Sequence, residues 1–321
     1  MNSYAKLVNG LEVAMDKKQK QELTMRYQKA VETFLEKIKK DVNVVAVIIS
    51  GSLAYDQVWE KSDIDTTIVV RDQALKKESF CLVEDDITIN VTVTTRSGFK
   101  RFLENLCGGS ILHSYFAKAT IVYSTDDSLY EYFEEFKAMG KDDVALSVFF
   151  LACELYYCYE KSLKWITVKE DPLYAQYYLL KAAEVIARIE VCLVGEVPTR
   201  EAIVNAKKIH PEALAAYYDL AMSHHYSKEE IMEAIHNIDK YLRSHLDIIK
   251  KPILTYMSDG EMKTVTMITK FFQTESHFIV GMLDYLADLG VIAKVSQTIR
   301  LTPKSKPAVE EITYQYIDFK F

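Results

Sequence analysis

Two short β-branched runs on either side of a glycine–serine bend constrain this chain more than any other feature. Residues 44–49 (VVAVII) are apolar, are too few for a typical helix, and stop at the Ser-Gly-Ser of residues 50–52. A second run of the same kind covers residues 65–70. Short apolar runs bounded by turn residues are typical of buried strands. The sequence therefore predicts two successive strands whose connection begins with a tight turn.

The flanking residues predict the rest of a mixed sheet. Residues 87–94 alternate Ile or Val with Thr or Asn, the period-two pattern of a half-buried strand. Residues 78–84 are expected to pair with them across the turn at Asp85-Asp86, and residues 119–123 to add an edge strand. Amphipathic helices are expected at 11–40 and 97–106. Together these elements predict one α/β (α+β) domain over residues 1–125.

Beyond residue 126 the pattern becomes helical. Leu, Ile, Ala and Tyr recur at helical spacing up to about residue 250, with breaks at Asp171-Pro172, at 195–198 and at His210-Pro211. This predicts an all-α helical bundle of about five helices over residues 126–250. Lys251-Pro252 is the expected boundary to a third domain, residues 251–321.

The last seventy residues predict a small winged-helix-like domain. Helices are expected at 262–272 and 277–289, with Thr274 or Ser276 capping the second and Gly290 ending it. Two strands, 291–295 and 298–302, are expected around a turn at Ser296-Gln297. Helix, turn, helix and hairpin in this order is the layout of a winged helix.

Two carboxylates stand at the start of the second predicted strand. Asp63 and Asp65 are separated by one residue, so strand alternation puts both side chains on one face. Carboxylates held together repel each other unless a cation lies between them. Magnesium prefers oxygen ligands and keeps positions for water and substrate phosphates. The pair is therefore predicted to hold Mg²⁺ or Mn²⁺; the alternative is a solvated turn in which Asp63 caps local backbone.

The bend before this pair is suited to a phosphate. Gly51 lets backbone N–H groups approach a ligand closely, and the Ser52 hydroxyl can donate to a phosphate oxygen. Lys61 and Ser62 flank the predicted metal site and are expected to contact a triphosphate. A phosphate cradle beside a metal pair is the equipment for nucleotidyl transfer, in which positioning and charge neutralisation supply most of the catalysis.

This order of residues resembles a known motif. The order is a strand, then Gly-Ser, then a step of eleven residues from Ser52 to Asp63, then Asp-x-Asp before a β-branched strand. This pattern is similar to the motif of the DNA polymerase β-like nucleotidyltransferase superfamily. The small bacterial members, which include the aminoglycoside and lincosamide nucleotidyltransferases, are the most similar. The resemblance covers about residues 44–100. It implies an NTP substrate, a metal ion and transfer of a nucleoside monophosphate to an acceptor.

One residue departs from the family pattern. The family places a third carboxylate on a later strand of the same sheet, where it helps to bind the metal or activates the attacking hydroxyl. Asn90 takes that place here, and a neutral amide cannot act as a base. Two hypotheses follow for a catalytic set of Asp63, Asp65 and Asn90. Either a carboxylate from elsewhere, such as Glu184, takes the role, or the site binds nucleotide without efficient transfer.

A second group of candidates lies on the helix predicted after Pro172. Tyr174, Tyr177 and Lys181 share one face of that helix. In the related enzymes the first helical domain faces the nucleotide, so the resemblance implies that Tyr177 stacks on the base and Lys181 meets a phosphate. The alternative, which general burial statistics favour, is a tyrosine-rich packing face with a solvated lysine.

Charge argues against DNA as the main partner. The formal net charge is −7, so the whole molecule has no electrostatic attraction to a polyanion. The predicted helix 277–289 carries Asp284 and Asp288 but no Lys or Arg, which favours packing or a homodimer contact over reading of bases. Phosphate contact by the wing stays open, because the wing carries Lys294, Arg300, Lys304 and Lys306.

Cysteine usage and hydropathy indicate the compartment. The five cysteines include no C-x-x-C pair, which suggests free thiols in a reducing environment. The first residues lack the pattern of a signal peptide, and no apolar run is long enough to span a bilayer. A cytoplasmic protein without membrane contact is expected.

The sequence thus predicts a metal-dependent nucleotidyltransferase acting on an unidentified acceptor. The alternative is a catalytically impaired nucleotide-binding regulator whose winged-helix-like module contacts a partner or DNA. A transcription factor that uses the same fold as a scaffold is a third hypothesis. The base preference and the oligomeric state are not specified by the sequence.

Overall fold

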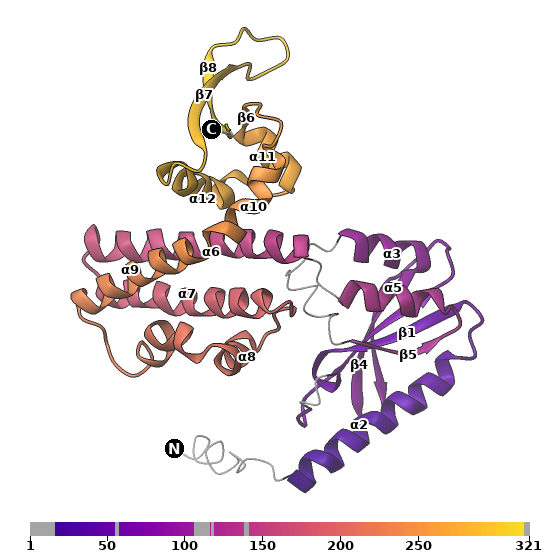
Figure 1. Ribbon diagram of the computed structural model, residues 1–321. Coiled ribbons are helices and arrows are strands. Elements are labelled where there is room, and N and C mark those ends of the chain that lie inside the picture. Colours follow the sequence, from indigo (N-terminus) through magenta and orange to yellow (C-terminus); the bar gives the residue numbers. More distant parts are fainter. Residues whose placement is uncertain (1–16, 55–57, 106–115, 117–118, 138–140, 318–321) are drawn as a thin grey trace, which may run out of the picture. The chain divides into compact units, whose positions relative to one another are not determined.

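The computed structural model describes residues 17–54, 58–105, 116, 119–137 and 141–317 (Figure 1). The chain divides into two compact units. The first unit comprises Met1–Leu106 and Leu112–Ala138, and the second comprises Cys107–Ile111 and Met139–Phe321. None of the described helices is both long and apolar enough to cross a membrane.

The first unit is built on a mixed five-stranded sheet with the strand order β3-β4-β2-β1-β5. Only the β2–β4 pair is parallel among these strands, so the mixed α/β sheet expected from the sequence is confirmed. All seven residues of β1 are buried, which explains its continuous apolar run. The strands are β1 (Val44–Ser50), β2 (Ile64–Val70), β3 (Ser79–Glu84), β4 (Ile87–Thr95) and β5 (Thr120–Ser124).

Helices cover both faces of this sheet (Figure 1). On one face, α2 (Lys17–Ile38) buries Tyr27 and Phe34 against β1, β2 and β4. On the other face, α3 (Arg96–Asn105) and α5 (Ser128–Lys137) form a smaller aromatic core. Because α5 packs Leu129 and Phe133 into that core, the first unit extends past residue 125, the expected end of the domain.

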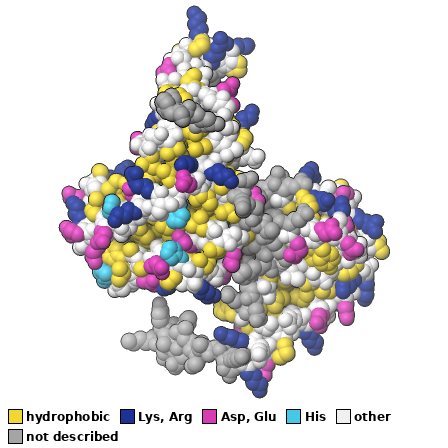
Figure 2. All heavy atoms as spheres, in the orientation of Figure 1, with side chains coloured by type: hydrophobic (Ala, Val, Ile, Leu, Met, Phe, Trp, Pro, Cys, Tyr) yellow, Lys and Arg dark blue, Asp and Glu magenta, His cyan; other side chains and the backbone are white. Residues whose placement is uncertain are grey.

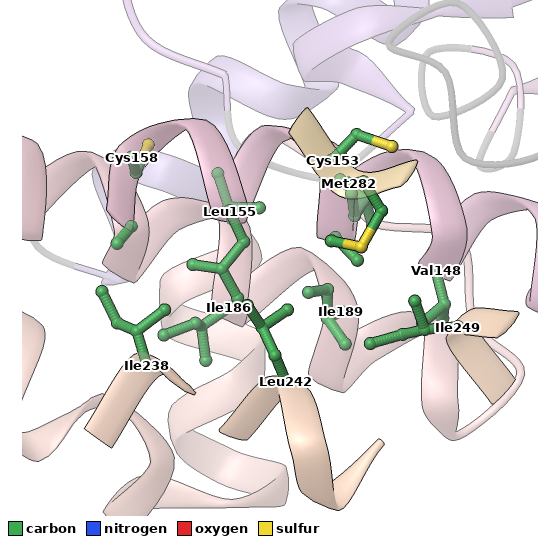
Figure 3. Packing of buried hydrophobic residues seen from close by; sticks show 14 of the residues in the cluster. Val148, Cys153, Leu155, Cys158, Ile186, Ile189, Ile238, Leu242, Ile249 and Met282 are labelled. Carbon is green, nitrogen blue, oxygen red and sulfur yellow. The ribbon is translucent and has the colours of Figure 1, made fainter. Parts of the chain in front are cut away.

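The second unit is centred on two long helices that follow each other in the chain and run side by side, α6 (Lys141–Thr167) and α7 (Pro172–Leu193). Figure 3 shows how side chains of these helices, such as Leu155 and Ile186, interlock with Ile238 and Leu242 from α9. The expected breaks are present: the Asp171 side chain caps α7 at the N–H of Tyr174, and His210 separates two helices. The remaining helices are α8 (Ala202–Ile209), short turns at Pro211–Leu214 and Ala215–Asp219, α9 (Lys228–Ser244) and α10 (Leu246–Tyr256).

The C-terminal elements follow in the order β6 (Lys263–Thr264), α11 (Val265–Phe272), α12 (Ser276–Asp288), β7 (Ala293–Ile299) and β8 (Val309–Gln315). The three strands form a sheet with the order β6-β8-β7. Phe272, Met282 and Tyr314 lie in the same hydrophobic cluster as the cores of α6 and α7. Because they share this core, the C-terminal elements belong to the second unit rather than to a compact unit of their own.

Pro252 does not end a helix, contrary to the expectation from the sequence. It lies inside α10, where a proline removes one backbone hydrogen bond and costs about 3 kcal/mol in a helix interior. Ile249 and Ile253 on the same helix are almost fully buried in the core of the unit. Their burial, about 2 kcal/mol for each side chain, outweighs that cost.

The C-terminal hairpin also differs from its prediction. Ser296 and Gln297, the expected turn, are paired within β7 to Ile312 and Glu311 of β8. The connection is the segment 300–308, which contains two prolines without the N–H that a strand ladder needs. At α12 neither expected cap is used, since Glu275 occupies the N-cap position without a side-chain hydrogen bond. Gly290, with φ of 72°, ends that helix as expected.

Burial of ionisable groups in the second unit predicts its behaviour in alkali. Burial raises the pKa of the Cys158 and Cys192 thiols to about 12, and burial raises the pKa of Tyr241, whose hydroxyl donates to Glu190 at 2.6 Å. A group with a raised folded-state pKa stabilises the fold below its unfolded pKa, near 9 for these thiols and 10 for tyrosine. We expect the free energy of unfolding to be constant from pH 7 to about 9 and to fall as the pH rises above that. Urea unfolding followed by circular dichroism at several pH values measures this, and equal stability at pH 7.5 and 10.5 would contradict it.

Candidate functional site

The structure brings together the three residues predicted to be catalytic. Asp63 precedes β2 and Asp65 lies within it, with the fully buried Ile64 between them, so both carboxylates point away from the α2 face. Asp65 is the register partner of Asn90 on the parallel strand β4. The Asn90 side-chain amide donates to Asp63 Oδ2 at 2.5 Å. The three side chains therefore form one group on one face of the sheet, beside the end of β1.

The bend after β1 lies directly against this group. Gly51 has a φ of 72°, in the left-handed region that favours glycine, and it begins a single 3₁₀ turn, Gly51–Leu53. A Cβ atom built on Gly51 would overlap Asp65 Oδ2 and lie 3.3 Å from its Cγ. The neighbouring Ser50 hydroxyl donates to the Asp65 carbonyl oxygen at 3.4 Å. A side chain at position 51 would thus displace the Asp65 carboxylate, and Ser52 sits half-buried in the same turn.

A tyrosine from α2 fixes the loop that leads to Asp63. The buried Tyr27 hydroxyl lies 2.7 Å from the carbonyl oxygen of Ser62 and 3.2 Å from that of Trp59. Burial raises the pKa of Tyr27 above its ordinary value, so its hydroxyl stays a donor in mildly alkaline solution as well as at neutral pH. Tyr27 was not predicted from the sequence to belong to the site. Its only signal was a tyrosine in the apolar stripe of a predicted amphipathic helix, where an aliphatic side chain would have been enough.

A polar cavity of about 250 Å³ opens beside Asp63. Lys61 and Ser62 line it, next to the carboxylate that they were expected to flank. The Ser62 hydroxyl also accepts a hydrogen bond from the backbone N–H of Trp59, at 3.1 Å, and so stabilises the turn. The other lining residues are Arg26, Tyr27, Glu60, Asp86, Ile87 and Thr88. Contact of Lys61 and Ser62 with a triphosphate stays a prediction.

The Asp85-Asp86 turn has the geometry of a tight hairpin. Both residues have positive φ, 49° and 62°, as a two-residue connection between antiparallel strands requires. Arg26 of α2 donates to the Asp85 carbonyl oxygen at 3.3 Å. Both carboxylates thus belong to the turn, and Asp86 lines the cavity beside Asp63. Asn90 is the β4 residue that aligns with Asp65 and donates to Asp63.

Tyr177 and Lys181 lie on α7 in the second unit. The Lys181 ammonium is 5.0 Å from the centre of the Tyr177 ring, and a hydrogen bond to Tyr177 raises the pKa of Lys181. Tyr177 also contacts Tyr174, whose ring packs on Trp165. These contacts match the expected shared face. Glu184, the carboxylate considered as a replacement for the missing third one, is exposed on the same helix. Its role, and the roles of Tyr177 and Lys181 in nucleotide binding, stay predictions.

The donor set at Asp63 and Asp65 fits a hard divalent cation. Two carboxylates on one face, beside a glycine whose missing side chain leaves room for the Asp65 oxygen, supply the oxygen ligands that Mg²⁺ prefers. In the described parts of the chain, no three or more His, Cys, Asp and Glu side chains converge on a common point. The protein thus offers two carboxylates and one amide, an open set that leaves positions for water and substrate oxygens.

The role of the Tyr27 hydroxyl can be tested by substitution. Tyr27→Phe removes the hydroxyl that holds the 59–62 turn, and we expect a loss of about 1–2 kcal/mol in the free energy of unfolding. The loosened turn should also weaken binding of a magnesium–NTP complex several-fold, because it contains Lys61 and Ser62 and leads directly to Asp63. Urea unfolding and titration calorimetry measure both effects. Tyr130→Phe, at an exposed tyrosine of α5, is the matched control, and an unchanged stability and affinity in Tyr27→Phe would refute the positioning role.

Comparison with known proteins agrees with this fold. No protein-family model matches the sequence, and a search of curated proteins found no match. Among solved structures, the chain is similar to a nucleotidyltransferase-like protein from Exiguobacterium sibiricum 255-15, with a TM-score of 0.63 and 15% sequence identity. The similarity covers 91% of this chain and 99% of that one, so it spans both units. The chain therefore has a nucleotidyltransferase-like fold over nearly its whole length.

Proposed function

We propose that this protein is a metal-dependent nucleotidyltransferase that moves a nucleoside monophosphate from an NTP to an acceptor hydroxyl or phosphate. The observation that carries the proposal is the contact between Gly51 and Asp65, because it joins the predicted phosphate bend and the predicted metal ligand in one site. Asn90 is the third residue of this site, because it is the register partner of Asp65 and donates a hydrogen bond to Asp63. The fold similarity supports the same class of reaction.

Each residue has a proposed role. Asp63 and Asp65 hold Mg²⁺ or Mn²⁺, which when bound neutralises phosphate charge. The backbone N–H groups and the hydroxyl at Gly51-Ser52 bind the β- and γ-phosphates. Lys61 and Ser62 contact the triphosphate from the neighbouring cavity.

The proposed transfer needs only the NTP and the acceptor as reactants. The acceptor oxygen forms a bond to the α-phosphorus, and the bond from that phosphorus to the bridging oxygen breaks. Pyrophosphate leaves with the electron pair, and the acceptor proton passes to solvent or to a base. Asn90 cannot take this proton, so the rate depends on another base, on solvent, or on an acceptor that is already ionised.

The Asn90–Asp63 hydrogen bond also favours a second candidate function. An amide N–H on Asp63 partly neutralises that carboxylate in the way a cation would, which stabilises the site without metal. A site of this kind suits a nucleotide-binding regulator with little turnover. In that case the β6-α11-α12-β7-β8 segment, proposed as a winged-helix-like module, transmits the nucleotide state to a partner or a second copy of the chain.

Contacts within this module disfavour DNA reading by α12. Asp284 of α12 accepts a hydrogen bond from Tyr314 and forms an ion pair with Lys294 of β7 at 2.7 Å. One of the basic residues of the wing is therefore engaged within the module. A DNA shift assay at low salt tests the remaining basic residues, and a salt-sensitive shift would restore DNA as a partner.

Titration calorimetry with ATP, GTP, CTP and UTP, each with Mg²⁺, tests the proposed function. Binding of at least one nucleotide is expected, and its loss on removal of Mg²⁺ would support metal dependence. Cys81 supplies an independent readout, because it is exposed and is the cross-strand partner of Asn90. Alkylation of Cys81, followed at the peptide level by mass spectrometry, should slow when the nucleotide is bound. If no nucleotide binds at millimolar concentration, the proposal fails.

A further inference from the structure

The sheet of the first unit has an open outer edge at β3. This strand is the last in the order β3-β4-β2-β1-β5, and five of its six residues are exposed. An unpaired edge attracts another strand, and proteins usually protect it with a lysine, a proline, a bulge or a very short strand. The other edge strands of the two described sheets follow this rule: β5 pairs with β1 through a shift of register, β6 has two residues, and β7 carries Lys294. The β3 sequence, SFCLVE, and its regular pairing with β4 contain none of these protections.

The pairing with β4 fixes which backbone groups of β3 face outward. The Val93 N–H donates to the Glu78 carbonyl oxygen at 2.7 Å, and bonded residues alternate along an antiparallel strand. Every second residue from Glu78 onward therefore bonds toward β4. The intervening residues, whose N–H and C=O groups point away from the sheet, are Ser79, Cys81 and Val83. In the described parts of the chain, no group bonds to these outward N–H and C=O groups, so the open edge offers three evenly spaced pairs of donor and acceptor centred on Cys81.

This edge is complementary to itself. A second β3 can pair antiparallel with the first so that Cys81 lies opposite the second copy's Cys81, on a two-fold axis. Ser79 of each chain then lies opposite Val83 of the other, and each pair of outward residues exchanges two backbone hydrogen bonds. On the other face of the strand, the exposed Phe80 lies opposite the exposed Leu82, so apolar side chains cover each other. Exposed hydrophobic side chains also occur elsewhere on the first unit (Figure 2), as on most proteins, but at β3 they accompany an open backbone edge.

Charges at the two ends of β3 match in the same arrangement. The strand is preceded by Lys76 and Lys77 and followed by Asp85 and Asp86. In the antiparallel pair, the lysines of each chain lie beside the aspartates of the other. None of these four side chains forms an ion pair in the described parts of the chain, and the Lys77 ammonium lies at the β3 edge, 4.8 Å from the centre of the Phe80 ring. The one like-charged pair is Glu78 opposite Glu84, and Lys37 already neutralises Glu84 at 2.5 Å.

We propose that two copies of this chain associate through β3 and join their sheets across a two-fold axis at Cys81. The contact is small, one strand of six residues from each copy, so the dimer is reversible with a Kd on the order of 10 µM. The proposal is independent of nucleotidyl transfer, since it uses none of the residues assigned to that reaction.

Sedimentation velocity of the full-length protein at about 1–200 µM measures this dimer, and its fraction should rise with concentration. Cys81→Lys puts two ammonium groups opposite each other at the axis and should raise the Kd about tenfold. Val42→Lys, at an exposed valine of the same unit, adds the same charge and should leave the Kd unchanged. Val83→Pro removes an outward N–H and keeps the bonds to β4, so it should also weaken the dimer while circular dichroism shows a folded protein.

Cross-linking with a short bis-maleimide, which adds to two thiols, reports the register of the two strands. The reagent should join two chains through the exposed Cys81. Cys81→Ser should lose the cross-link and keep the dimer, whereas Cys107→Ser should keep both. Without nucleotide, alkylation of Cys81 should slow as the protein concentration rises, while slowing by nucleotide at constant protein concentration reports the carboxylate group instead. A monomer at the highest concentration, an equal Kd in Cys81→Lys and Val42→Lys, or a cross-link that survives Cys81→Ser would overturn the proposal.

Discussion

Replacing Asp65 with asparagine is expected to reduce nucleotidyl transfer by a factor of about 100 or more. The variant keeps the shape of the side chain that lies against Gly51, so the packing of the bend is retained. It removes one of the two negative charges available to a divalent cation. The loss should therefore appear as weaker metal and nucleotide binding rather than as unfolding.

Two quantities must be measured for Asp65→Asn, its affinity for the magnesium–nucleotide complex and its melting temperature. Calorimetry with the nucleotide that binds best and Mg²⁺ should show an affinity loss for Asp65→Asn, while its melting temperature stays equal to or above that of the unmodified protein, because one of two neighbouring like charges is gone. Asp127→Asn, at an exposed aspartate of the first unit, controls for the change in net charge. Undiminished magnesium-dependent binding in Asp65→Asn would remove Asp65 from the proposed metal site.

The local elements of the first unit were predictable because their signals are local. Continuous β-branched residues specify β1, period-two alternation specifies β4, and two left-handed aspartates close the hairpin between β3 and β4. Strand alternation alone put Asp63 and Asp65 on one face. The position of Gly51 beside Asp65 depends on the structure, which shows β1 and β2 as adjacent antiparallel strands that pair Ser50 with Asp65.

The remaining site contacts depend on residues far apart in the chain. Tyr27 reaches the Ser62 carbonyl oxygen across 35 positions, and only the packing of α2 on the sheet reveals it. The Asn90–Asp63 hydrogen bond depends on the parallel register of β2 and β4. Pro252 lies inside α10 although proline is a local helix-breaking signal, because its neighbours are buried in a core built from distant helices. The roles of all these residues in nucleotide chemistry stay predictions.

Restoring a carboxylate at position 90 is expected to have the second large effect. In Asn90→Asp, the hydrogen bond to Asp63 is lost and a third negative charge lies beside Asp63 and Asp65. Without metal, the like charges should lower the free energy of unfolding by about 1 kcal/mol. With Mg²⁺, the same charges become ligands, so the melting temperature should rise with magnesium concentration more steeply than in the unmodified protein.

Activity of this variant separates the two proposed functions. If the chain is an enzyme weakened by the neutral amide, Asn90→Asp should raise transfer by about 10- to 100-fold, the usual contribution of a carboxylate that activates the attacking group. Thr92→Asp adds the same charge to the same face of β4, two residues further along, and should leave transfer unchanged. Nucleotide binding without turnover in both Asn90 and Asn90→Asp proteins would instead support the regulator. A magnesium response no steeper in Asn90→Asp than in Thr92→Asp would remove position 90 from the proposed metal site, because it would mean that this position does not reach the cation that Asp63 and Asp65 are proposed to hold.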